Sequence, residues 1–251
     1  MLVDIHNHIL PGLDDGAKSM EEAMLLATNA VANGMTHIIA TPHHHNGKYM
    51  NASSVVEDAV VNFNKELSEK AIPLQILPGQ EIHLYNSIPQ DLDKDLLTLA
   101  NSRKYILIEL PTNHIPTFTF DILFQIQLRG YIPIIAHPER NMVFRKDKQK
   151  LYDLVNKGSL VQITASSLIG EKGRALKKYT KKLIKHNLVH FISSDSHHYV
   201  RRPFLLKDAY QYVREKFSED HVTYYSENAK HVIFGTVFQP IPPISFKKTR
   251  D

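Results

Sequence analysis

Seven short apolar runs recur along the chain, separated by longer segments with helical spacing. Each run is too short for a helix, and most are rich in Ile, Val or Leu, which is typical of buried strands in a parallel sheet. The predicted strands are Leu2–Ile5, His37–Ala40, Leu74–Leu77, Tyr105–Leu110, Ile132–Ala136, Leu160–Thr164 and Val189–Ser193.

The segments between these runs predict helices. Ser19 and Glu22 form a capping box ahead of apolar residues at helical spacing, and Gly34 ends that helix. Ser54 with Glu57 repeats the capping signal. Further helices are predicted over Phe120–Arg129, Lys148–Lys157, Gly173–His186 and Phe204–Phe217. This alternation of strands and helices predicts right-handed βαβ units.

An open sheet and a closed barrel both have this alternation, and the polar residues at the strand ends distinguish them. Nearly every run ends in an unusual cluster: HNH, TPHHH, GQE, IEL, AHPER or SSDSH. In a barrel the C-terminal ends of all strands meet at one mouth, whereas an open sheet keeps its edge strands apart. We therefore expect an α/β fold, a distorted seven-stranded TIM-like barrel with its site at the C-terminal ends of the strands. Residues 1–235 form this single domain, and 236–251 form a Pro-rich basic tail, extended or loosely docked.

Composition excludes several classes of protein. Of the 251 residues, 43% are hydrophobic and 22% charged, which is ordinary for a folded protein and not for a disordered one. Cysteine is absent, which excludes disulfides, thiolate metal sites and every cysteine-nucleophile mechanism, including that of the familiar tyrosine phosphatases.

Charge and the N-terminal sequence bear on partners and location. The net charge is +4, with basic residues in 172–185 and at Lys247, Lys248 and Arg250. No aromatic platform accompanies them, so we expect no nucleic-acid binding. The start lacks the basic region of a secretory signal, and no apolar stretch approaches the roughly 18 residues of a membrane span. We predict a cytoplasmic protein without membrane insertion and leave its oligomeric state open.

The histidines at the strand ends point to a metal centre. His6 and His8 lie two residues apart in a strand and so face the same way, and Asp195 and His197 repeat this spacing. Mixed imidazole and carboxylate donors suit Mn, Fe or Zn, and nine donors suit two or three ions better than one. The candidate donors are His6, His8, Asp15, His43, Glu81, Glu109, His137, Asp195 and His197.

Six segments carry a family resemblance: DIHNHILPGLDDGAKS, ATPHHHNG, PGQEI, YILIELP, PIIAHPERN and FISSDSHH. Together they resemble the polymerase and histidinol phosphatase (PHP) family, and within it the manganese-dependent bacterial protein tyrosine phosphatases of the CpsB/CapC type. The resemblance covers most of the chain. It implies a phosphotyrosine protein substrate, a bacterial tyrosine kinase as partner, and a role in capsule or exopolysaccharide control.

The resemblance also implies how the donors divide among Mn²⁺ ions, with Fe or Zn as alternatives. The first ion would be held by His6, His8 and Asp195, with Glu81 bridging to the second; Glu109 and His137 would complete the second; Asp15, His43 and His197 would hold the third. Asp14 is an alternative to Asp15, which directly precedes Gly16 as the family's acid precedes its glycine. Arg140 and Arg202 match arginines that contact phosphate.

Phosphate monoesters resist hydrolysis because their anionic oxygens repel a nucleophile. Metal ions offset this charge and lower the pKa of bound water, and two arginines stabilise the equatorial oxygens. The candidates for protonating the leaving group are His43, His197 and a metal-bound water.

Four other functions are alternatives to the tyrosine phosphatase hypothesis. A histidinol phosphatase or another small-molecule PHP phosphoesterase would use the same metal site. Amidohydrolases and TatD nucleases place a His at the end of the sixth strand, where this chain has QITASS. PHP exonuclease modules are normally fused to polymerases. A non-catalytic metal-binding scaffold for a kinase would be expected to have lost ligands, and none is lost here.

Overall fold

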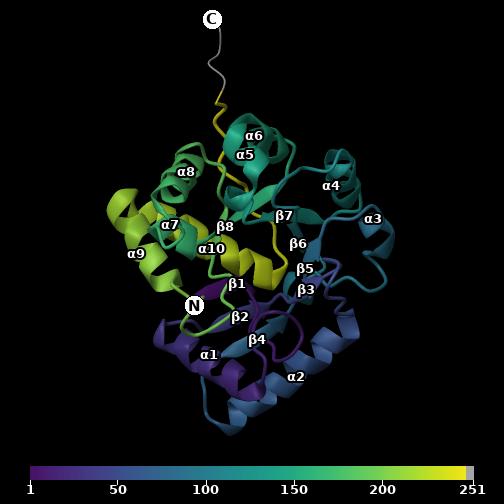
Figure 1. The fold of residues 1–251 in the computed structure, drawn as a ribbon, viewed down its shortest axis with the longest axis vertical. Helices are drawn as coiled ribbons and strands as arrows, with labels where there is room; N and C mark the ends of the chain where they lie inside the picture. Colours follow the sequence, from purple (N-terminus) through teal and green to yellow (C-terminus); the bar gives the residue numbers. More distant parts are fainter. Residues whose placement is uncertain (247–251) are drawn as a thin grey trace, which may run out of the picture.

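Parallel strands form the centre of the protein, and helices surround them (Figure 1). The computed structural model describes residues 1–246. One sheet contains β1 (Val3–Asn7), β2 (His37–Ala40) and β4 (Gln75–Pro78). The second contains β3 (His43–His44), β5 (Glu81–His83), β6 (Tyr105–Glu109), β7 (Ile132–Ala136), β8 (Leu160–Thr164) and β9 (Phe191–Ser193), in that order.

The two sheets are connected at both ends. Only two residues separate β2 from β3, and two separate β4 from β5. At the other end, the backbone N–H of Asp195 donates to the carbonyl of His6, and that of His8 donates to the carbonyl of Ser196, both at 3.0 Å. Every strand pairing within the two sheets is parallel, so the C-terminal strand ends point the same way.

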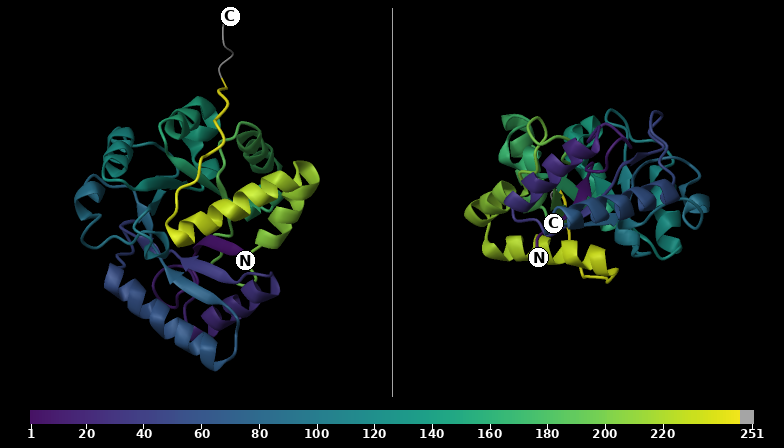
Figure 2. Two further views of the ribbon diagram at one scale, coloured as in Figure 1. Left: turned by 180° about the vertical axis from the view of Figure 1, so that it is seen from behind. Right: turned by 90° about the horizontal axis from the view of Figure 1, so that it is seen from below.

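The helices follow the strands along the chain. They are α1 (Met20–Ala32), α2 (Ser53–Glu69), α3 (Ile88–Asp91), α4 (Thr119–Leu128), α5 (Met142–Lys146), α6 (Lys148–Asn156), α7 (Ala165–Ile169), α8 (Arg174–Lys185), α9 (Leu206–Lys216) and α10 (Glu219–Phe234), with short 3₁₀ turns η1 (Leu99–Asn101) and η2 (Pro138–Arg140). Helix α10 lies across the back of the strands (Figure 2). Within the described residues, no helix is long and apolar enough to cross a membrane.

The core has two layers because strand side chains alternate between faces. On β6, Tyr105 and Leu107 belong to an inner cluster that the strands share with α10, whereas Ile106 and Ile108 belong to the larger cluster among the other helices. The inner layer includes Phe191 and is apolar toward the N-terminal ends of the strands. The polar site therefore lies at the opposite, C-terminal ends.

Each of the seven predicted runs overlaps a strand, but the structure contains nine strands in two sheets among residues 1–246. The additional strands, β3 and β5, are continuations of β2 and β4 after a break. Pro42 lacks a backbone donor at the first break. At the second, a Cβ on Gly79 would lie 2.9 Å from the side chain of Ile39, so the chain passes too close for another residue.

Two helix predictions differ from the structure. The Ser54–Glu57 capping box is wrong: α2 begins at Ser53, whose backbone N–H and hydroxyl both donate to Asp95 at 2.9 and 3.0 Å. Helix α10 was not predicted from the sequence, although Ser218 caps its start and Gly235, with φ 64°, ends it. The Ser19 cap on α1 is confirmed.

The tail to residue 246 has no helix or strand, yet it contacts the body of the protein. The backbone N–H of Ile244 donates to the carbonyl of His186 at 2.8 Å, and Phe246 stacks on the His186 ring with centroids 3.8 Å apart. Asn187 donates to the carbonyl of Pro242 at 3.0 Å. The basic residues Lys247, Lys248 and Arg250 lie outside the described residues.

His190 is buried beside β9, away from the strand-end donors, and gives the fold a pH dependence. Its Nδ1 accepts the backbone N–H of Val161 at 3.0 Å, so the ring is neutral and carries its proton on Nε2, which has no hydrogen-bond partner. Burial lowers the pKa of His190 to about 3. The unfolded chain therefore binds a proton below about pH 6.5 that the folded chain refuses.

We predict that His190→Asn makes the free energy of unfolding less sensitive to acid. The wild-type protein loses up to about 1.4 kcal/mol per pH unit through this histidine as the pH falls from 6.5 toward 3. Urea unfolding at pH 7.5, 6.5, 5.5 and 4.5 should show a shallower decline in the variant. His231→Asn, on α10, is the control and should decline as the wild type does. Parallel curves for His190→Asn and wild type would contradict this account.

Candidate metal centre

Strand β1 brings His6 and His8 to the centre of the site through a change of register. Its pairing with β2 shifts by one residue between Asp4 and Asn7, which is a bulge. Val3 and Ile5 point into the inner apolar layer, so regular alternation would turn His6 and His8 away from it. A bulge redirects the following side chains, and bulges are frequent next to active sites. In the structure Nε2 of His6 lies 3.2 Å from Nε2 of His8.

Glu81, at the start of β5, is the carboxylate around which the histidines gather. It is fully buried. Its Oε1 lies 3.3 Å from His6 Nε2 and 2.8 Å from His137 Nε2, and its Oε2 lies 3.4 Å from His8 Nε2 and 2.9 Å from His43 Nδ1. Burial alone would raise the pKa of Glu81, but His6 and His43 hold it well below its usual value. The carboxylate is therefore ionised.

Glu109, at the end of β6, lies on one side of this centre. Its Oε1 is 3.7 Å from His137 Nε2, and its Oε2 is 3.9 Å from His43 Nδ1. His83, which was not among the predicted donors, lies 3.2 Å from Oε2 of Glu109. The structure thus brings a third imidazole to this carboxylate.

Asp15 lies on the other side, in the loop after β1. Its Oδ1 is 3.4 Å from His43 Nε2 and 3.3 Å from His197 Nε2. Asp14 points elsewhere: its Oδ2 lies 2.6 Å from Nδ1 of His8 and accepts the backbone N–H of His43 at 3.0 Å. Asp15 therefore faces the donor cluster directly, and Asp14 orients His8 from behind.

Asp195 divides its two oxygens between different partners. Its Oδ1 lies 3.4 Å from His8 Nε2 and 3.6 Å from His6 Nε2. Its Oδ2 accepts hydrogen bonds from Arg140 at 2.6 Å and Arg202 at 2.8 Å. Burial opposes ionisation, but Arg140 and the neighbouring histidines hold the pKa of Asp195 well below its usual value.

Two of the donors sit on unusual backbone. His137 and Asp195 have φ angles of 31° and 52°, in the left-handed region that residues other than glycine seldom adopt. Such conformations cost about 1–3 kcal/mol each and cluster at functional sites. The fold therefore tolerates backbone strain at two positions where the chain turns a side chain into this cluster.

The residues present fit divalent metal ions. His43 Nδ1 and Glu81 Oε2 are buried, lie 2.9 Å apart, and still have no partner with hydrogen-bond geometry. The Nε2 atoms of His6 and His8 lie 3.2 Å apart beside the buried carboxylate of Glu81. This arrangement suits the binding of one cation by both nitrogens better than a hydrogen bond between them. Three groups converge closely enough to ligate an ion: His8, Asp15, His43 and His197; His6, His8 and Glu81; and His43, Glu81 and Glu109.

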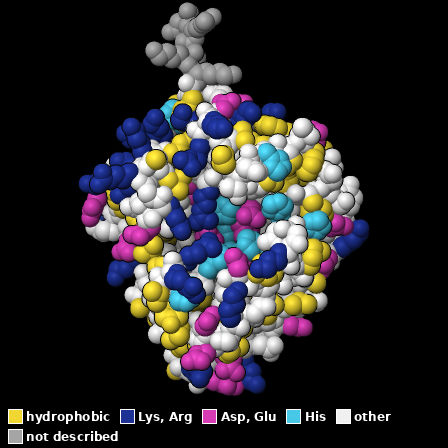
Figure 3. All heavy atoms as spheres, viewed as in Figure 1, with side chains coloured by type: hydrophobic (Ala, Val, Ile, Leu, Met, Phe, Trp, Pro, Cys, Tyr) yellow, Lys and Arg dark blue, Asp and Glu magenta, His cyan; other side chains and the backbone are white. Residues whose placement is uncertain are grey.

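The structure brings all nine predicted donors and both predicted arginines together, and Figure 3 shows histidine and acidic side chains gathered in a central hollow. Sequence reasoning missed Gln162. Its Oε1 lies 3.0 Å from Nδ1 of His6 and accepts the backbone N–H of His137 at 3.3 Å. Patterns of metal ligands contain no amide side chain, so they do not point to a glutamine. The only sign of its role in the sequence was a polar residue inside the apolar strand LVQIT.

Fold and site together define an α/β protein with a cluster of histidines and carboxylates at the C-terminal ends of parallel strands. Residues 2–234 match the family described as capsular polysaccharide synthesis, CpsB/CapC. The chain belongs to this family, which confirms the resemblance found in the sequence.

Two known proteins and one solved structure show how far the similarity extends. The tyrosine-protein phosphatase YwqE of Bacillus subtilis is 43% identical, over 98% of each chain. The putative tyrosine-protein phosphatase CapC of Staphylococcus aureus is 38% identical, over 99% of this chain and 98% of CapC. A chain from the crystal structures of YwqE from Bacillus subtilis and CpsB from Streptococcus pneumoniae, described as unique metal-dependent tyrosine phosphatases, matches with a TM-score of 0.95 and 42% identity, covering 98% of this chain and all of that one.

We predict that Asp14→Asn weakens metal binding without changing the number of ions bound. The amide keeps the acceptor for the His43 N–H but removes the charge that holds and polarises His8. Loss of such a supporting group typically lowers metal affinity about 10- to 100-fold. Isothermal titration of chelator-stripped protein with Mn²⁺ measures both quantities.

Asp15→Asn provides the contrast, because it alters a side chain that faces the donor cluster and should lower the number of ions bound. Asp93→Asn, which alters an exposed aspartate paired with Arg129, is the control and should bind as the wild type does. Unchanged affinity in Asp14→Asn would show that Asp14 has no supporting role.

Proposed function

We propose that this protein is a metal-dependent protein tyrosine phosphatase. The observation that carries the proposal is the position of Asp195 between two groups of side chains, which we call the junction. Its Oδ1 faces the metal donors His6 and His8, and its Oδ2 binds two arginines. Such a junction provides for a metal ion and a phosphate group side by side. Relatives named as tyrosine phosphatases, matched over nearly the full chain, support the substrate class.

The division of the donors among ions is part of the proposal. One ion would use His6, His8 and Asp195, with Glu81 shared; a second would use Glu109 and His137; a third would use Asp15, His43 and His197. Two or three ions fit this donor set, and Mn²⁺ is the proposed metal, with Fe or Zn as alternatives that use the same ligands. Bound metal would supply a hydroxide nucleophile at neutral pH and offset the charge of the phosphate.

Arg140 and Arg202 would bind the phosphate and stabilise its equatorial oxygens. A guanidinium has five N–H donors, so hydrogen bonding to Asp195 leaves each arginine with donors for phosphate. Asp195 also fixes the position of both side chains before substrate arrives, and donors positioned in advance favour the transition state.

The leaving group is a phenoxide whose conjugate acid has a pKa near 10, so it needs only modest help from an acid. His43 and His197 are the protein groups proposed to supply that proton. Burial lowers the pKa of His43, but Glu81 outweighs this and raises it overall. Burial, followed by the charge of His8, lowers the pKa of His197 to about 4.

Several finer features belong to the proposal. The two sheets would act together as a distorted seven-stranded barrel, with β2 and β3 as one interrupted strand and β4 and β5 as another. The barrel would span residues 1–235, with 236–251 as its tail. The substrate would be a phosphotyrosine protein, with a bacterial tyrosine kinase of capsule or exopolysaccharide control as partner. The cytoplasmic location and the absence of nucleic-acid binding stay predictions.

We predict metal-dependent release of phosphate from a phosphotyrosine peptide. Chelator-stripped protein should be inactive, should regain activity with Mn²⁺, and should act poorly on histidinol phosphate assayed in parallel. His6→Ala should abolish activity because it removes a donor next to Glu81, whereas His231→Ala, on α10, should retain it.

Preference for histidinol phosphate would show that the same site hydrolyses a small-molecule phosphate ester and not phosphotyrosine proteins. Absence of release from either substrate, with bound metal demonstrated, would refute the phosphatase proposal.

A further inference from the structure

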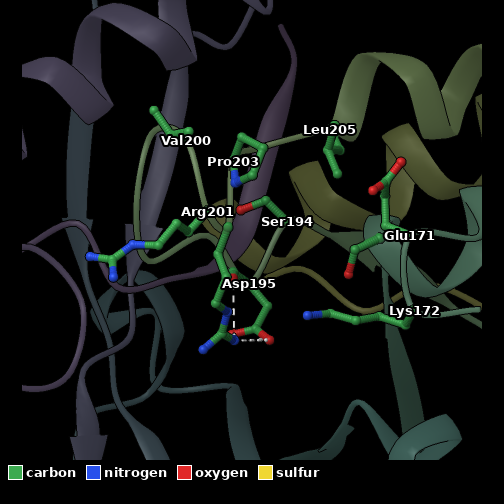
Figure 4. Close-up of a pocket in the computed structure, with 10 residues that line it drawn as sticks. Glu171, Lys172, Ser194, Asp195, Val200, Arg201, Pro203 and Leu205 are labelled. Atoms are coloured by element: carbon green, nitrogen blue, oxygen red, sulfur yellow. Dashed lines mark hydrogen bonds and ion pairs between the residues drawn. The ribbon is translucent and has the colours of Figure 1, made fainter.

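A cavity of about 280 Å³ lies directly beside the metal centre. Figure 4 shows its walls, which come from the connection between α7 and α8, from the end of β9, and from the loop before α9. Asp195 and Arg202 line it, and both also belong to the site described above. Whatever occupies the cavity is therefore a neighbour of a phosphate bound by Arg202. This volume is at the lower limit of ligand pockets and suits one side chain.

The cavity has an excess of positive charge. Lys172 and Arg201 line it together with Arg202. Asp195 already has hydrogen bonds from Arg202 and Arg140 on one oxygen. Basic side chains gather on one side of the central hollow (Figure 3).

Two cations that line the cavity, Lys172 and Arg201, make no side-chain hydrogen bond or ion pair within residues 1–246. The guanidinium of Arg201 is directed away from Asp195 in Figure 4, which leaves the ammonium group of Lys172 as the unpaired cation beside Asp195. In Figure 4 this group extends toward Asp195, whereas the carboxylate of Glu171 is directed away from it, toward Leu205. The ammonium group of Lys172, next to the Asp195 carboxylate that Arg202 already engages, is thus the free cationic group of the cavity.

Electrostatics support this placement. Partial burial lowers the pKa of Lys172, and the charges of Arg140 and Arg202 lower it further. Three cations thus lie close enough to disfavour one another, and the charges of Asp195 and Glu171 only partly offset this. An anion entering the cavity would relieve that repulsion and gain charge-assisted hydrogen bonds.

We propose that this cavity is a subsite for an aspartate or glutamate side chain next to the phosphotyrosine, and that Lys172 recognises its carboxylate. The inference rests on the proposed phosphatase function and adds sequence preference to it. Successive Cα atoms in a peptide are 3.8 Å apart, so a residue one or two positions from the phosphotyrosine can reach a cavity that shares Arg202 with the phosphate site. Val200, Pro203 and Leu205 would pack against its methylene groups.

Steady-state kinetics on the metal-loaded enzyme test the proposal. Three peptides would carry one phosphotyrosine with Glu, Gln or Lys at the two positions on each side, and p-nitrophenyl phosphate would serve as a substrate without flanks. We expect KM for the Glu peptide to be about five- to tenfold below that for the Gln peptide, with kcat unchanged. A difference of this size corresponds to the binding free energy of one partly exposed hydrogen bond between charged groups. The Lys peptide should bind worst.

Lys172→Met should remove the difference between the Glu and Gln peptides and leave p-nitrophenyl phosphate hydrolysis unchanged. Lys178→Met, which removes an exposed lysine of α8 outside the cavity, is the matched control and should keep the full preference.

The outcomes separate the subsite from the underlying function. Equal KM values for the Glu and Gln peptides in the wild type would overturn the subsite while the phosphatase function stands. An equal loss on every substrate in Lys172→Met, including p-nitrophenyl phosphate, would also overturn it, because Lys172 would then act on the phosphate or on folding. Absence of hydrolysis of all substrates by metal-loaded wild type would instead refute the phosphatase proposal.

Discussion

The arrangement of this site depends on the burial of one ionised carboxylate. Glu81 has no exposed surface, and four imidazoles surround it within 3.4 Å. An isolated carboxylate cannot stay charged in such a place, because its desolvation cost is several kcal/mol. The converging histidines offset that cost, and divalent ions would offset it further. The need to offset this buried charge also accounts for the side chains that hydrogen-bond to the histidines, since each histidine must direct a particular ring nitrogen toward Glu81. Asp14 and Gln162 set that orientation for His8 and His6.

Much of this was predictable because strands convert sequence spacing into direction. Residues two apart share a face, and parallel strands end at one edge, so HNH and DSH at the ends of two apolar runs had to meet. Gln162 was not predictable, because its role depends on the register between β8 and its neighbours and no sequence pattern encodes it. The bulge in β1 was hidden for the same reason: it appears only as a shift in pairing with β2.

The errors in the fold prediction have similar causes. Helix α2 is capped by Asp95, which lies 42 residues beyond the Ser53 that it contacts, so a local capping motif gave the wrong signal. The strands β3 and β5 are too short to show periodicity, yet they carry His43 and Glu81. Their positions follow from pairing with each other and with β6, which is a tertiary effect. Local signals thus missed the two short strands that hold these donors, although they located the longer strands.

Asp195 couples the two halves of the proposed chemistry. One of its oxygens faces His6 and His8, and the other holds Arg140 and Arg202. A cation on the first oxygen would withdraw charge from the second, which would weaken both hydrogen bonds without releasing the arginines and leave their N–H groups better able to donate to an anion. Metal binding and phosphate binding would then favour each other through a single side chain. Lys172 stands outside this exchange, because it has no bond to Asp195 to give up, and its charge is available to a substrate whether or not the arginines are engaged.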